Sequence, residues 1–362
     1  MKIAFLTGNL RNGGAQRVVS VLANGISKKG HTVSLLTFAK HEAEYPIADD
    51  VELVYMKQSE DEYDQYPLLL RLRDVRVFLK KQKPDVAVGF MEAGYALFLA
   101  SRGLGVKCIG SIRNHPERLM ERKDFRAVLT RMWFRHADAV VLQTKRQADY
   151  VKDLGWKNCA VIPNPIPESI SCYSHSAAVR EGNATLKIMM AGRLVQQKNY
   201  PIALQAFHKL AEDGVDFTAD IYGEGKEEKK LRELIESLQL SEKVTLRGWI
   251  PNVVEEMCRH HIYILSSDYE GMPNSLMEAL GVGMVCISTD CFSGPAEMID
   301  HGVNGFLVPV GDHDGLYKTL VQVSRMEEQE LKSISENAKR RIAEDYNEMH
   351  IVEMWEKLFQ SC

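Results

Sequence analysis

The most restrictive feature of this 362-residue sequence is an alternation of short apolar segments with longer amphipathic ones. The apolar run Lys2–Thr7 is followed by a glycine-containing loop and by Ala15–Lys29, where apolar residues recur with a helical period. Repetition of this order predicts parallel strands joined by helices, because parallel neighbours need a crossover connection. The sequence therefore predicts an α/β protein whose parallel sheets are covered by helices on both faces.

The alternation is interrupted at Val161–Pro167, where three of the seven residues are prolines. Proline removes backbone donors and excludes helix, so this segment and the polar stretch Glu168–Thr185 predict a linker. The alternation resumes at Lys187–Ala191. We therefore predict two doubly wound domains, residues 1–165 and 166–345, with ligand crevices at the carboxyl ends of their strands.

The end of the chain is predicted to be helical. A helix at about 346–362 carries Trp355, Leu358 and Phe359, and we expect it to pack back on the first domain.

Composition narrows the class of protein. Apolar residues make up 45% of the chain and charged residues 26%, which is typical of a globular protein and excludes a disordered or fibrous one. No apolar run approaches the roughly 20 residues of a membrane-spanning helix, and no signal peptide is recognised. The seven cysteines lack CxxC spacing, so we expect reduced thiols and a cytoplasmic location.

The net charge of −4 conceals an uneven distribution. Residues 1–163 hold 26 basic and 18 acidic side chains, whereas residues 164–362 hold 19 basic and 31 acidic ones. The basic excess lies mainly in residues 65–135, and Arg118–Arg135 interleaves basic with apolar residues. This region is either a solvated basic face or a surface for an anionic partner, such as the inner face of the cell membrane. The overall balance argues against nucleic acid as a partner.

Two glutamates eight positions apart form the strongest candidate site. The motif Glu270–Glu278 follows the predicted strand Ile262–Leu265, and Pro273-Asn274 indicates a helix start. Backbone N–H groups at that start would face a ligand, and paired carboxylates bind sugar hydroxyls through charge-assisted hydrogen bonds. The alternative is a solvated glutamate followed by an ordinary surface residue.

A second candidate follows the first strand of the second half. Arg193 and Lys198 lie in the segment Ala191–Lys198, which leads into a predicted helix. Two cations at such a turn suit a diphosphate, and they would stabilise the negative charge that develops on a leaving diphosphate. A solvated pair of loop cations is the alternative.

A third candidate is the loop Asn12-Gly-Gly-Ala-Gln-Arg17 after the first strand. Its glycines allow close backbone approach to an anion or a sugar, but the spacing is not GxGxxG. A plain tight turn explains it equally well.

Together these motifs resemble family 4 of the retaining glycosyltransferases, which have the GT-B fold: two Rossmann-like domains facing across a cleft. The resemblance includes Ser293–Ile299 and extends from the first strand to about Val310. It is closest to bacterial enzymes of polysaccharide and oligosaccharide assembly. It implies transfer of a hexose or N-acetylhexosamine from a UDP-sugar with retention of configuration, without a metal or other cofactor, by front-face displacement or through a covalent intermediate.

The resemblance also implies roles for individual residues. Glu270, Arg193 and Lys198 would be catalytic, with the two cations on the donor diphosphate, Glu270 on the donor sugar and Glu278 on the ribose. The donor-binding residues it implies are Gly14, Gly192, Arg193, Lys198, Gly223, Ile250, Glu270, Gly271, Met272, Pro273, Asn274, Ser275, Leu276 and Glu278.

The sequence departs from the family pattern on the acceptor side. Gln16 stands where many relatives have glutamate, and either Arg113 or His115 takes the place of a histidine that faces the donor sugar. The segment Asp312-His-Asp314 mimics a metal-binding DxD motif, but Asp314 is better explained as a helix N-cap, so no metal site is predicted.

The predicted protein is a cytoplasmic glycosyltransferase, peripheral at the inner membrane face. Its expected acceptor is a saccharide or a lipid-linked saccharide, with polyprenyl diphosphate as the expected carrier. A nucleotide-sugar 2-epimerase on the same scaffold and a non-catalytic nucleotide-sugar-binding protein are the two alternatives.

Overall fold

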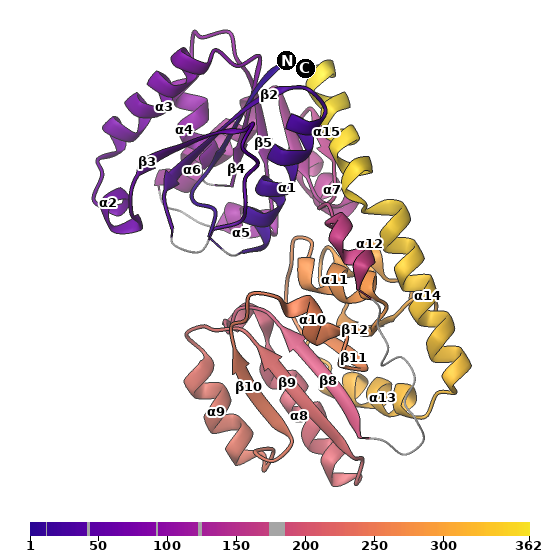
Figure 1. Cartoon of the computed structure of the whole chain (residues 1–362). Helices are drawn as coiled ribbons and strands as arrows, with labels where there is room; N and C mark the ends of the chain where they lie inside the picture. Colours follow the sequence, from indigo (N-terminus) through magenta and orange to yellow (C-terminus); the bar gives the residue numbers. More distant parts are fainter. Residues whose placement is uncertain (12, 42–43, 92, 122–124, 174–184) are drawn as a thin grey trace. The chain divides into compact units, whose positions relative to one another are not determined.

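The computed structural model describes residues 1–362 except 12, 42–43, 92, 122–124 and 174–184 (Figure 1). The chain forms two compact units. Unit 1 consists of Met1–Pro165 and Glu348–Cys362, and unit 2 consists of Ile166–Asn347.

Unit 1 is built on a seven-stranded sheet in the order β3-β2-β1-β4-β5-β6-β7, with every strand parallel to its neighbours. Its strands are β1 (Lys2–Thr7), β2 (Thr32–Ala39), β3 (Glu52–Lys57), β4 (Val86–Phe90), β5 (Lys107–Ser111), β6 (Ala139–Leu142) and β7 (Cys159–Val161). Its helices are α1 (Gly14–Lys28), α2 (Glu60–Asp64), α3 (Leu68–Gln82), α4 (Ala93–Ala100), α5 (Pro116–Glu121), α6 (Phe125–His136), α7 (Lys145–Asp153) and α15 (Glu348–Ser361).

Unit 2 is built on a six-stranded parallel sheet in the order β10-β9-β8-β11-β12-β13. Its strands are β8 (Leu186–Ala191), β9 (Phe217–Tyr222), β10 (Val244–Gly248), β11 (Ile262–Leu265), β12 (Val285–Thr289) and β13 (Phe306–Val308). Its helices are the 3-10 turns η1 (Glu168–Cys172) and η2 (Gln196–Lys198), then α8 (Tyr200–Glu212), α9 (Glu228–Ser237), α10 (Val253–Met257), α11 (Asn274–Val282), α12 (Pro295–Met298), α13 (His313–Ser324) and α14 (Glu328–Asp345).

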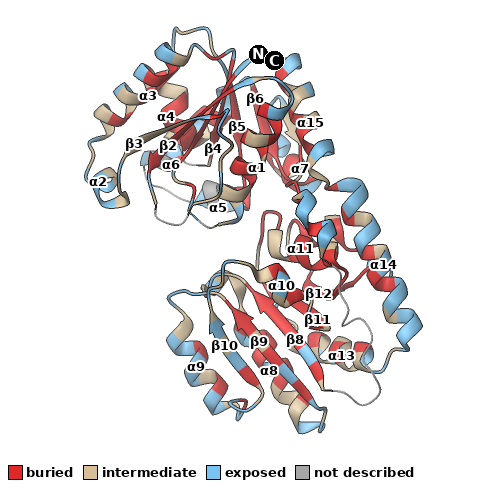
Figure 2. Cartoon of the chain, viewed as in Figure 1, coloured by how far each residue is buried: buried red, intermediate tan, exposed pale blue. Residues whose placement is uncertain are grey.

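Alternate strand residues point to two separate cores in unit 1. Ala4 and Leu6 pack on one face of the sheet with α3, α4 and α6, whereas Ile3 and Phe5 pack on the other face with α1 and α15. Figure 2 shows the inner strands as buried, between helices whose outer faces are exposed, whereas the edge strands β3 and β7 are only partly buried. The α/β class with parallel sheets is confirmed.

Helix α15 contributes its apolar stripe to unit 1. Trp355 and Phe359 are almost completely buried beside Phe5 and Phe90, and Leu358 is partly buried against the same core. Gly25 of α1 makes room for this helix, since a Cβ there would lie 2.5 Å from a methyl carbon of Val352.

The sequence pattern missed two strands, β7 and β13, of three residues each. Segments this short carry too few side chains to show a period of two. The predicted element Arg118–Arg135 is described as two helices, α5 and α6, and residues 122–124 between them lie outside the described part of the chain.

Candidate functional site

The carboxyl edge of the unit 2 sheet brings two of the predicted motifs together. Strands β8 and β11 are hydrogen-bonded neighbours at the point where the strand order reverses. The loop after β8 carries Arg193 and Lys198, and the loop after β11 carries Glu270. Ligands of doubly wound sheets bind at such a reversal, so the topology marks this edge as the candidate site.

Lys198 and Glu270 form a buried ion pair at this edge. Lys198 Nζ lies 2.7 Å from Glu270 Oε1, and the two side chains are 14% and 9% exposed. Ser267 Oγ donates a second hydrogen bond to the same oxygen at 2.6 Å, and Gln197 Nε2 lies 3.5 Å from Oε2. These bonds offset the desolvation that burial imposes on both charges. The solvated alternative for Glu270 is therefore wrong.

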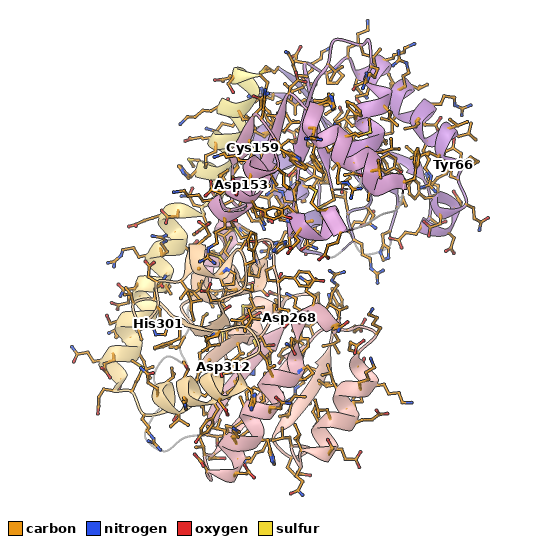
Figure 3. The ribbon with its side chains drawn as sticks, turned by 180° about the vertical axis from the view of Figure 1, so that it is seen from behind. Tyr66, Asp153, Cys159, Asp268, His301 and Asp312 are labelled. Atoms are coloured by element: carbon orange, nitrogen blue, oxygen red, sulfur yellow. The ribbon has the colours of Figure 1, made fainter. Side chains whose placement is uncertain are left out.

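The loops after β8 and β11 are also joined through other residues. Asn199 Nδ2 donates to Asp268 Oδ1 at 2.6 Å, and the Asp268 amide donates to the Gln197 carbonyl at 2.9 Å. Ser266 Oγ donates to the Lys198 carbonyl at 2.8 Å. Figure 3 labels Asp268 among the side chains of unit 2. Lys198 is thus held by both its side chain and its backbone.

Arg193 differs from Lys198 because it is exposed. Within the described part of the chain its guanidinium has no hydrogen-bond or ion-pair partner, so its five donors remain available to a ligand. The site therefore offers one anchored cation and one free cation from the same loop.

Glycines let the loops after β8 and β9 approach closely. Gly223 has a φ of +134°, and a Cβ there would lie 1.9 Å from the Gly192 carbonyl oxygen. A Cβ on Gly225 would lie 2.3 Å from the Leu194 carbonyl oxygen. Backbone hydrogen bonds from Gly192 and Leu194 then join the two loops at 2.9 and 2.8 Å. Larger residues would force these loops apart.

The Ser293–Ile299 segment packs against the loop that carries Glu270 and bonds its backbone. Ser293 Oγ lies 2.9 Å from the Glu270 carbonyl oxygen and 3.0 Å from that of Gly271. Gly294 has a φ of +95°, and a Cβ there would lie 2.7 Å from the Gly271 carbonyl oxygen. This part of the predicted motif positions the loop.

Helix α11 places the second glutamate in the interior. Its first intrahelical bond runs from the Met277 amide to the Pro273 carbonyl at 3.1 Å, so the amides of Asn274, Ser275 and Leu276 precede that bond. Glu278 follows in the second turn and is only 4% exposed. A surface role for Glu278 is therefore wrong. Met272, Pro273 and Leu276 are buried, whereas Asn274 and Ser275 are half-buried.

Two buried tyrosines bond the backbone at the end of β8, beside the candidate site. Tyr200 donates to the Gly192 carbonyl at 3.0 Å. Tyr263 donates to the Ala191 carbonyl at 3.1 Å, and its single hydroxyl hydrogen leaves it to accept from Ser275 Oγ at 2.8 Å. Burial raises the pKa of both phenols, and the nearby Glu270 carboxylate raises them further. Both therefore remain protonated donors.

A buried thiol near the ion pair is not a nucleophile. Burial, assisted by Glu270, raises the pKa of Cys291 to about 12, so the thiol stays neutral at physiological pH.

The remaining predicted residues of unit 2 lie on the next loop along the edge. The Gly223 amide donates to the Gly248 carbonyl at 2.8 Å, which places the turn after β10 beside the turn after β9. Ile250 is half-buried against the local core, whereas Trp249 is 48% exposed.

The glycine loop of unit 1 is partly described. Residue 12 lies outside the described part of the chain, Gly13 is extended, and Gly14 is the exposed first residue of α1. A Cβ on Gly13 would lie 2.6 Å from Gln16 Oε1, so the Gln16 side chain is folded back onto this loop. Thirteen of the fourteen predicted donor residues lie in unit 2, and Gly14 lies in unit 1.

Arg113 and His115 both have buried side chains in unit 1. Arg113 Nε donates to Ser111 Oγ at 2.8 Å and Nη1 donates to Asn164 Oδ1 at 3.0 Å. His115 Nδ1 accepts from the Glu117 amide at 3.1 Å and so caps the start of α5. His115 thus has a local structural role at the start of α5.

The basic region 65–135 is partly core and partly surface. Trp133 and Phe134 are buried, and Trp133 packs so closely that a Cβ on Gly94 would lie 1.9 Å from its ring. Phe125, Val128 and Met132 of α6 are instead exposed. Their i, i+3, i+7 spacing puts them on one helix face.

Among the described residues, no group of three or more His, Cys, Asp or Glu side chains is arranged to hold a metal ion. The residue that caps α13 is Asp312, whose Oδ1 accepts from the Gly315 amide at 2.8 Å, and not Asp314 as predicted. Asp314 instead pairs with Lys209, because it lies two residues after the cap and is already part of the first helical turn.

Sequence reasoning missed most of the residues that hold the site together, namely Gln197, Asn199, Tyr200, Tyr263, Ser266, Ser267 and Asp268. One signal could have found some of them. Ser266 and Ser267 follow directly on an apolar strand, where side chains reach the carboxyl edge of a sheet.

Two family models match adjacent parts of the chain. The model for Glycosyltransferase Family 4 matches residues 12–169, and that for Glycosyl transferases group 1 matches residues 175–341.

Full-length and partial relatives both occur. The GalNAc-alpha-(1->4)-GalNAc-alpha-(1->3)-diNAcBac-PP-undecaprenol alpha-1,4-N-acetyl-D-galactosaminyltransferase of Campylobacter jejuni is 27% identical over 99% of this chain and 98% of its own length. An exopolysaccharide phosphotransferase of Streptomyces coelicolor is 34% identical, but the match spans 61% of this chain and only 23% of that protein.

Solved structures share the fold of this chain. Sucrose-phosphate synthase from Thermosynechococcus elongatus matches with a TM-score of 0.86 at 14% identity, covering 100% of this chain and 98% of that one. HepE from Anabaena, solved in complex with UDP and glucose, matches with a TM-score of 0.81 at 18% identity and covers 100% of both chains. The predicted GT-B fold is thereby confirmed. The chain belongs to glycosyltransferase family 4 and is a glycosyltransferase of the GT-B fold.

Proposed function

We propose that this chain is a retaining, metal-independent hexosyltransferase that takes a hexose or N-acetylhexosamine from a UDP-sugar. The acceptor is a saccharide linked to polyprenyl diphosphate, and the product belongs to a cell-surface polysaccharide or glycan. The observation that carries the proposal is the largely buried Lys198–Glu270 pair, with Arg193 on the same loop exposed and unpaired among the residues that the structure describes.

The chemistry follows from the charges. Arg193 and Lys198 bind the donor diphosphate and stabilise the charge that develops as the glycosyl bond breaks. This positive charge substitutes for a divalent cation. Glu270 accepts from a hydroxyl of the donor sugar, Glu278 accepts from the ribose, and the amides at the start of α11 face the sugar.

UDP as the nucleotide is supported by HepE, which has been solved with UDP and glucose. A lipid-linked acceptor is supported by the Campylobacter jejuni relative, whose name specifies a PP-undecaprenol-linked glycan.

The test is a thermal-shift panel of UDP- and GDP-sugars, followed by assays with a polyprenyl-diphosphate-linked saccharide. A matching donor stabilises the protein by mass action, about 2.7 kcal/mol at 100 times its Kd. NMR of the product should show a retained anomeric configuration, and EDTA should leave the rate unchanged. Stabilisation by GDP-sugars alone, an inverted product or inhibition by EDTA would each overturn the corresponding part of the proposal.

The same donors distinguish the two alternatives. An epimerase would convert UDP-GlcNAc without any acceptor. A non-catalytic binding protein would be stabilised by the donor, yet transfer nothing to any acceptor offered.

We also propose that unit 1 associates with an anionic membrane through region 65–135, at the cytoplasmic face. No described helix is long and apolar enough to cross a membrane. The exposed Phe125, Val128 and Met132 stripe on α6 lies beside Arg131 and Arg135, so apolar insertion and charge attraction would act together.

The membrane proposal is tested by flotation with vesicles containing phosphatidylglycerol. Binding should weaken as salt rises from about 0.1 to 1 M, because screening shortens the reach of the charges. Phe125→Ser with Met132→Ser should weaken binding further. Flotation that is absent, or indifferent to salt, would contradict the proposal.

A further inference from the structure

Unit 1 contains a buried guanidinium that the proposed chemistry does not use. Arg113 is 8% exposed and follows β5. Its Nε and Nη1 donate to Ser111 Oγ and Asn164 Oδ1, while Nη2 is buried and has no hydrogen-bond partner within the described ranges of the chain. The guanidinium carbon lies 5.6 Å from the centre of the Phe90 ring and 5.5 Å from that of Trp355.

The contacts of Arg113 reach both places where the chain passes between the units. Asn164 immediately precedes Pro165, the last residue of the first segment of unit 1. Trp355 belongs to α15, which begins at Glu348, the first residue after the chain returns to unit 1. Arg113 therefore contacts both the segment at which the chain leaves unit 1 (the outgoing segment, ending at Pro165) and the segment at which it re-enters unit 1 (the returning segment, beginning at Glu348).

The same two segments are paired with each other on the unit 2 side. The Ile166 amide donates to the Tyr346 carbonyl at 2.8 Å, and Ile166 forms a parallel bridge with Asn347. The two connections are thus joined directly in unit 2, and Arg113 joins them in unit 1.

The Asn164 side chain is fixed by two donors. Gln143 Nε2 donates to Asn164 Oδ1 at 2.8 Å, so this oxygen accepts from both Gln143 and Arg113. Because both donors need an acceptor, the amide can adopt only one orientation. Gln143 follows β6, so the ends of β5 and β6 are both tied to the outgoing segment.

No carboxylate among the described residues pairs with Arg113 to balance its charge. Its partners are a hydroxyl, an amide oxygen and two aromatic faces, and burial lowers its pKa to about 9. Holding a buried cation in this way is costly, and apolar packing would serve stability better. The planar guanidinium, which bonds Asn164 and lies over two aromatic rings, instead fixes the orientation of the groups around it. A flexible apolar side chain cannot do this.

We propose that Arg113 is a positioning residue for glycosyl transfer, acting through Asn164 and Trp355 to fix the course of both connecting segments without touching the donor. This inference rests on the proposed function, because it concerns the rate of transfer. It predicts that disturbing Arg113 lowers kcat while leaving UDP binding intact, since all the predicted donor residues except Gly14 lie in unit 2.

The experiment measures kcat, the Kd for UDP and the unfolding midpoint for Arg113→Met, Arg113→Lys, Asn164→Leu and Asn164→Asp. Arg113→Met and Asn164→Leu should lower kcat by about tenfold or more, because small misplacements of reacting groups are amplified in rate. The Kd for UDP should change less than about twofold. Asn164→Asp keeps both accepted bonds and should stay within about threefold of wild type. Arg113→Lys keeps the charge but not the fork, and should fall in between.

The matched control is Arg71→Met. Arg71 is another buried arginine of unit 1 that covers an aromatic ring, Tyr63, at 3.8 Å, and it bonds backbone carbonyls far in sequence from either connection. Since it is buried, it does not contribute to the exposed basic surface. Its loss should lower the unfolding midpoint without lowering the kcat of the folded enzyme.

The double variant Arg113→Met with Asn164→Leu should be no slower than the slower single variant, because each single variant already removes the Arg113–Asn164 hydrogen bond. Wild-type kcat in Arg113→Met or Asn164→Leu, a matching loss of UDP affinity, or an equal loss in Arg71→Met would overturn the proposal. If Arg113→Met does not fold, the two Asn164 variants still decide it. Failure of the proposed function would look different, since the wild-type protein itself would then transfer no sugar.

Discussion

Each unit has a largely buried cation in a loop that follows a strand, and the surroundings of the two cations differ. Lys198 in unit 2 is bonded to the carboxylate of Glu270 at 2.7 Å, whereas Arg113 in unit 1 lies against Asn164 and two aromatic rings. The ion pair makes Lys198 and Glu270 depend on each other, because removing either one leaves an uncompensated buried charge. In the described part of unit 1, Arg113 has no such carboxylate partner, so its neighbours fix its orientation more than they neutralise its charge.

The largest expected effect comes from breaking the ion pair. Lys198→Met should lower kcat by about 10²–10³-fold. Other enzymes lose about this much when one preorganised group that stabilises the charge of the transition state is removed. The substitution should also lower the free energy of unfolding by about 3 kcal/mol, because Glu270 stays buried without its cation. Initial rates at saturating donor and urea unfolding measure the two effects.

A surface ion pair of the same unit provides the control. Lys209 pairs with Asp314 where both side chains are substantially exposed. Lys209→Met should change the free energy of unfolding by less than about 1 kcal/mol and leave the rate unaltered. Equal losses in the two lysine variants would mean that burial does not distinguish the pairs.

The next effect concerns the close approach of the loops after β8 and β9. Gly223→Ala should destabilise unit 2 by about 2 kcal/mol and weaken UDP binding, since its Cβ would meet the Gly192 carbonyl and its φ is unfavourable. Gly214 also has a positive φ, of +73°, but a Cβ there meets nothing within 4 Å. Gly214→Ala should therefore cost only about 1 kcal/mol. Calorimetry of both variants separates the effect of the steric contact from that of backbone strain. Equal losses of unfolding free energy would mean that backbone strain alone explains the effect of Gly223→Ala.

A carboxylate at position 164 would make the surroundings of Arg113 resemble those of Lys198. Asn164→Asp should raise the free energy of unfolding by about 1 kcal/mol at pH 7, because the bond to Arg113 becomes charge-assisted. Burial lowers the pKa of Arg113 to about 9. Below pH 9 the folded wild-type protein therefore holds a charged, buried guanidinium that destabilises it, and this destabilisation decreases as the pH rises above 9 and the guanidinium loses its proton. The advantage of the aspartate should therefore shrink above about pH 9. Urea unfolding from pH 7 to 10 tests this, and a gain that grows with pH would contradict it.

The smallest effect is expected at an ion pair away from the site. Asp220 accepts from Arg247 Nε at 2.8 Å and faces His260 Nε2 at 3.1 Å. Burial opposes ionisation of Asp220, but these two bonds outweigh it and its pKa lies below the ordinary value. Its contribution is therefore complete at neutral pH and is lost as pH falls below about 4.

Asp220→Asn should accordingly cost about 1 kcal/mol at pH 7 and progressively less in acid. Thermal unfolding of both proteins between pH 3 and 7 gives the difference. A difference that widens on acidification would show that the sign is wrong.

Much of the candidate site could be predicted because its residues follow apolar strands. Arg193, Lys198, Glu270 and Glu278 each lie in a loop or helix start after a strand that hydrophobic pattern alone identifies. The periodicity could not show that Lys198 bonds Glu270, because 72 residues separate them and the contact exists only through the pairing of β8 with β11. Nor could it show that Arg113 turns inward, since arginine is usually exposed.

The sequence by itself determined the α/β class, the parallel sheets and the strand ends that carry the chemistry, because side-chain period and proline placement act locally along the chain. Only the tertiary structure decided which of those residues meet. The order in which strands pair joins Lys198 to Glu270 and brings Asn164 and Trp355 to Arg113. Such contacts depend on the burial of a whole unit, and no local pattern of residues encodes them.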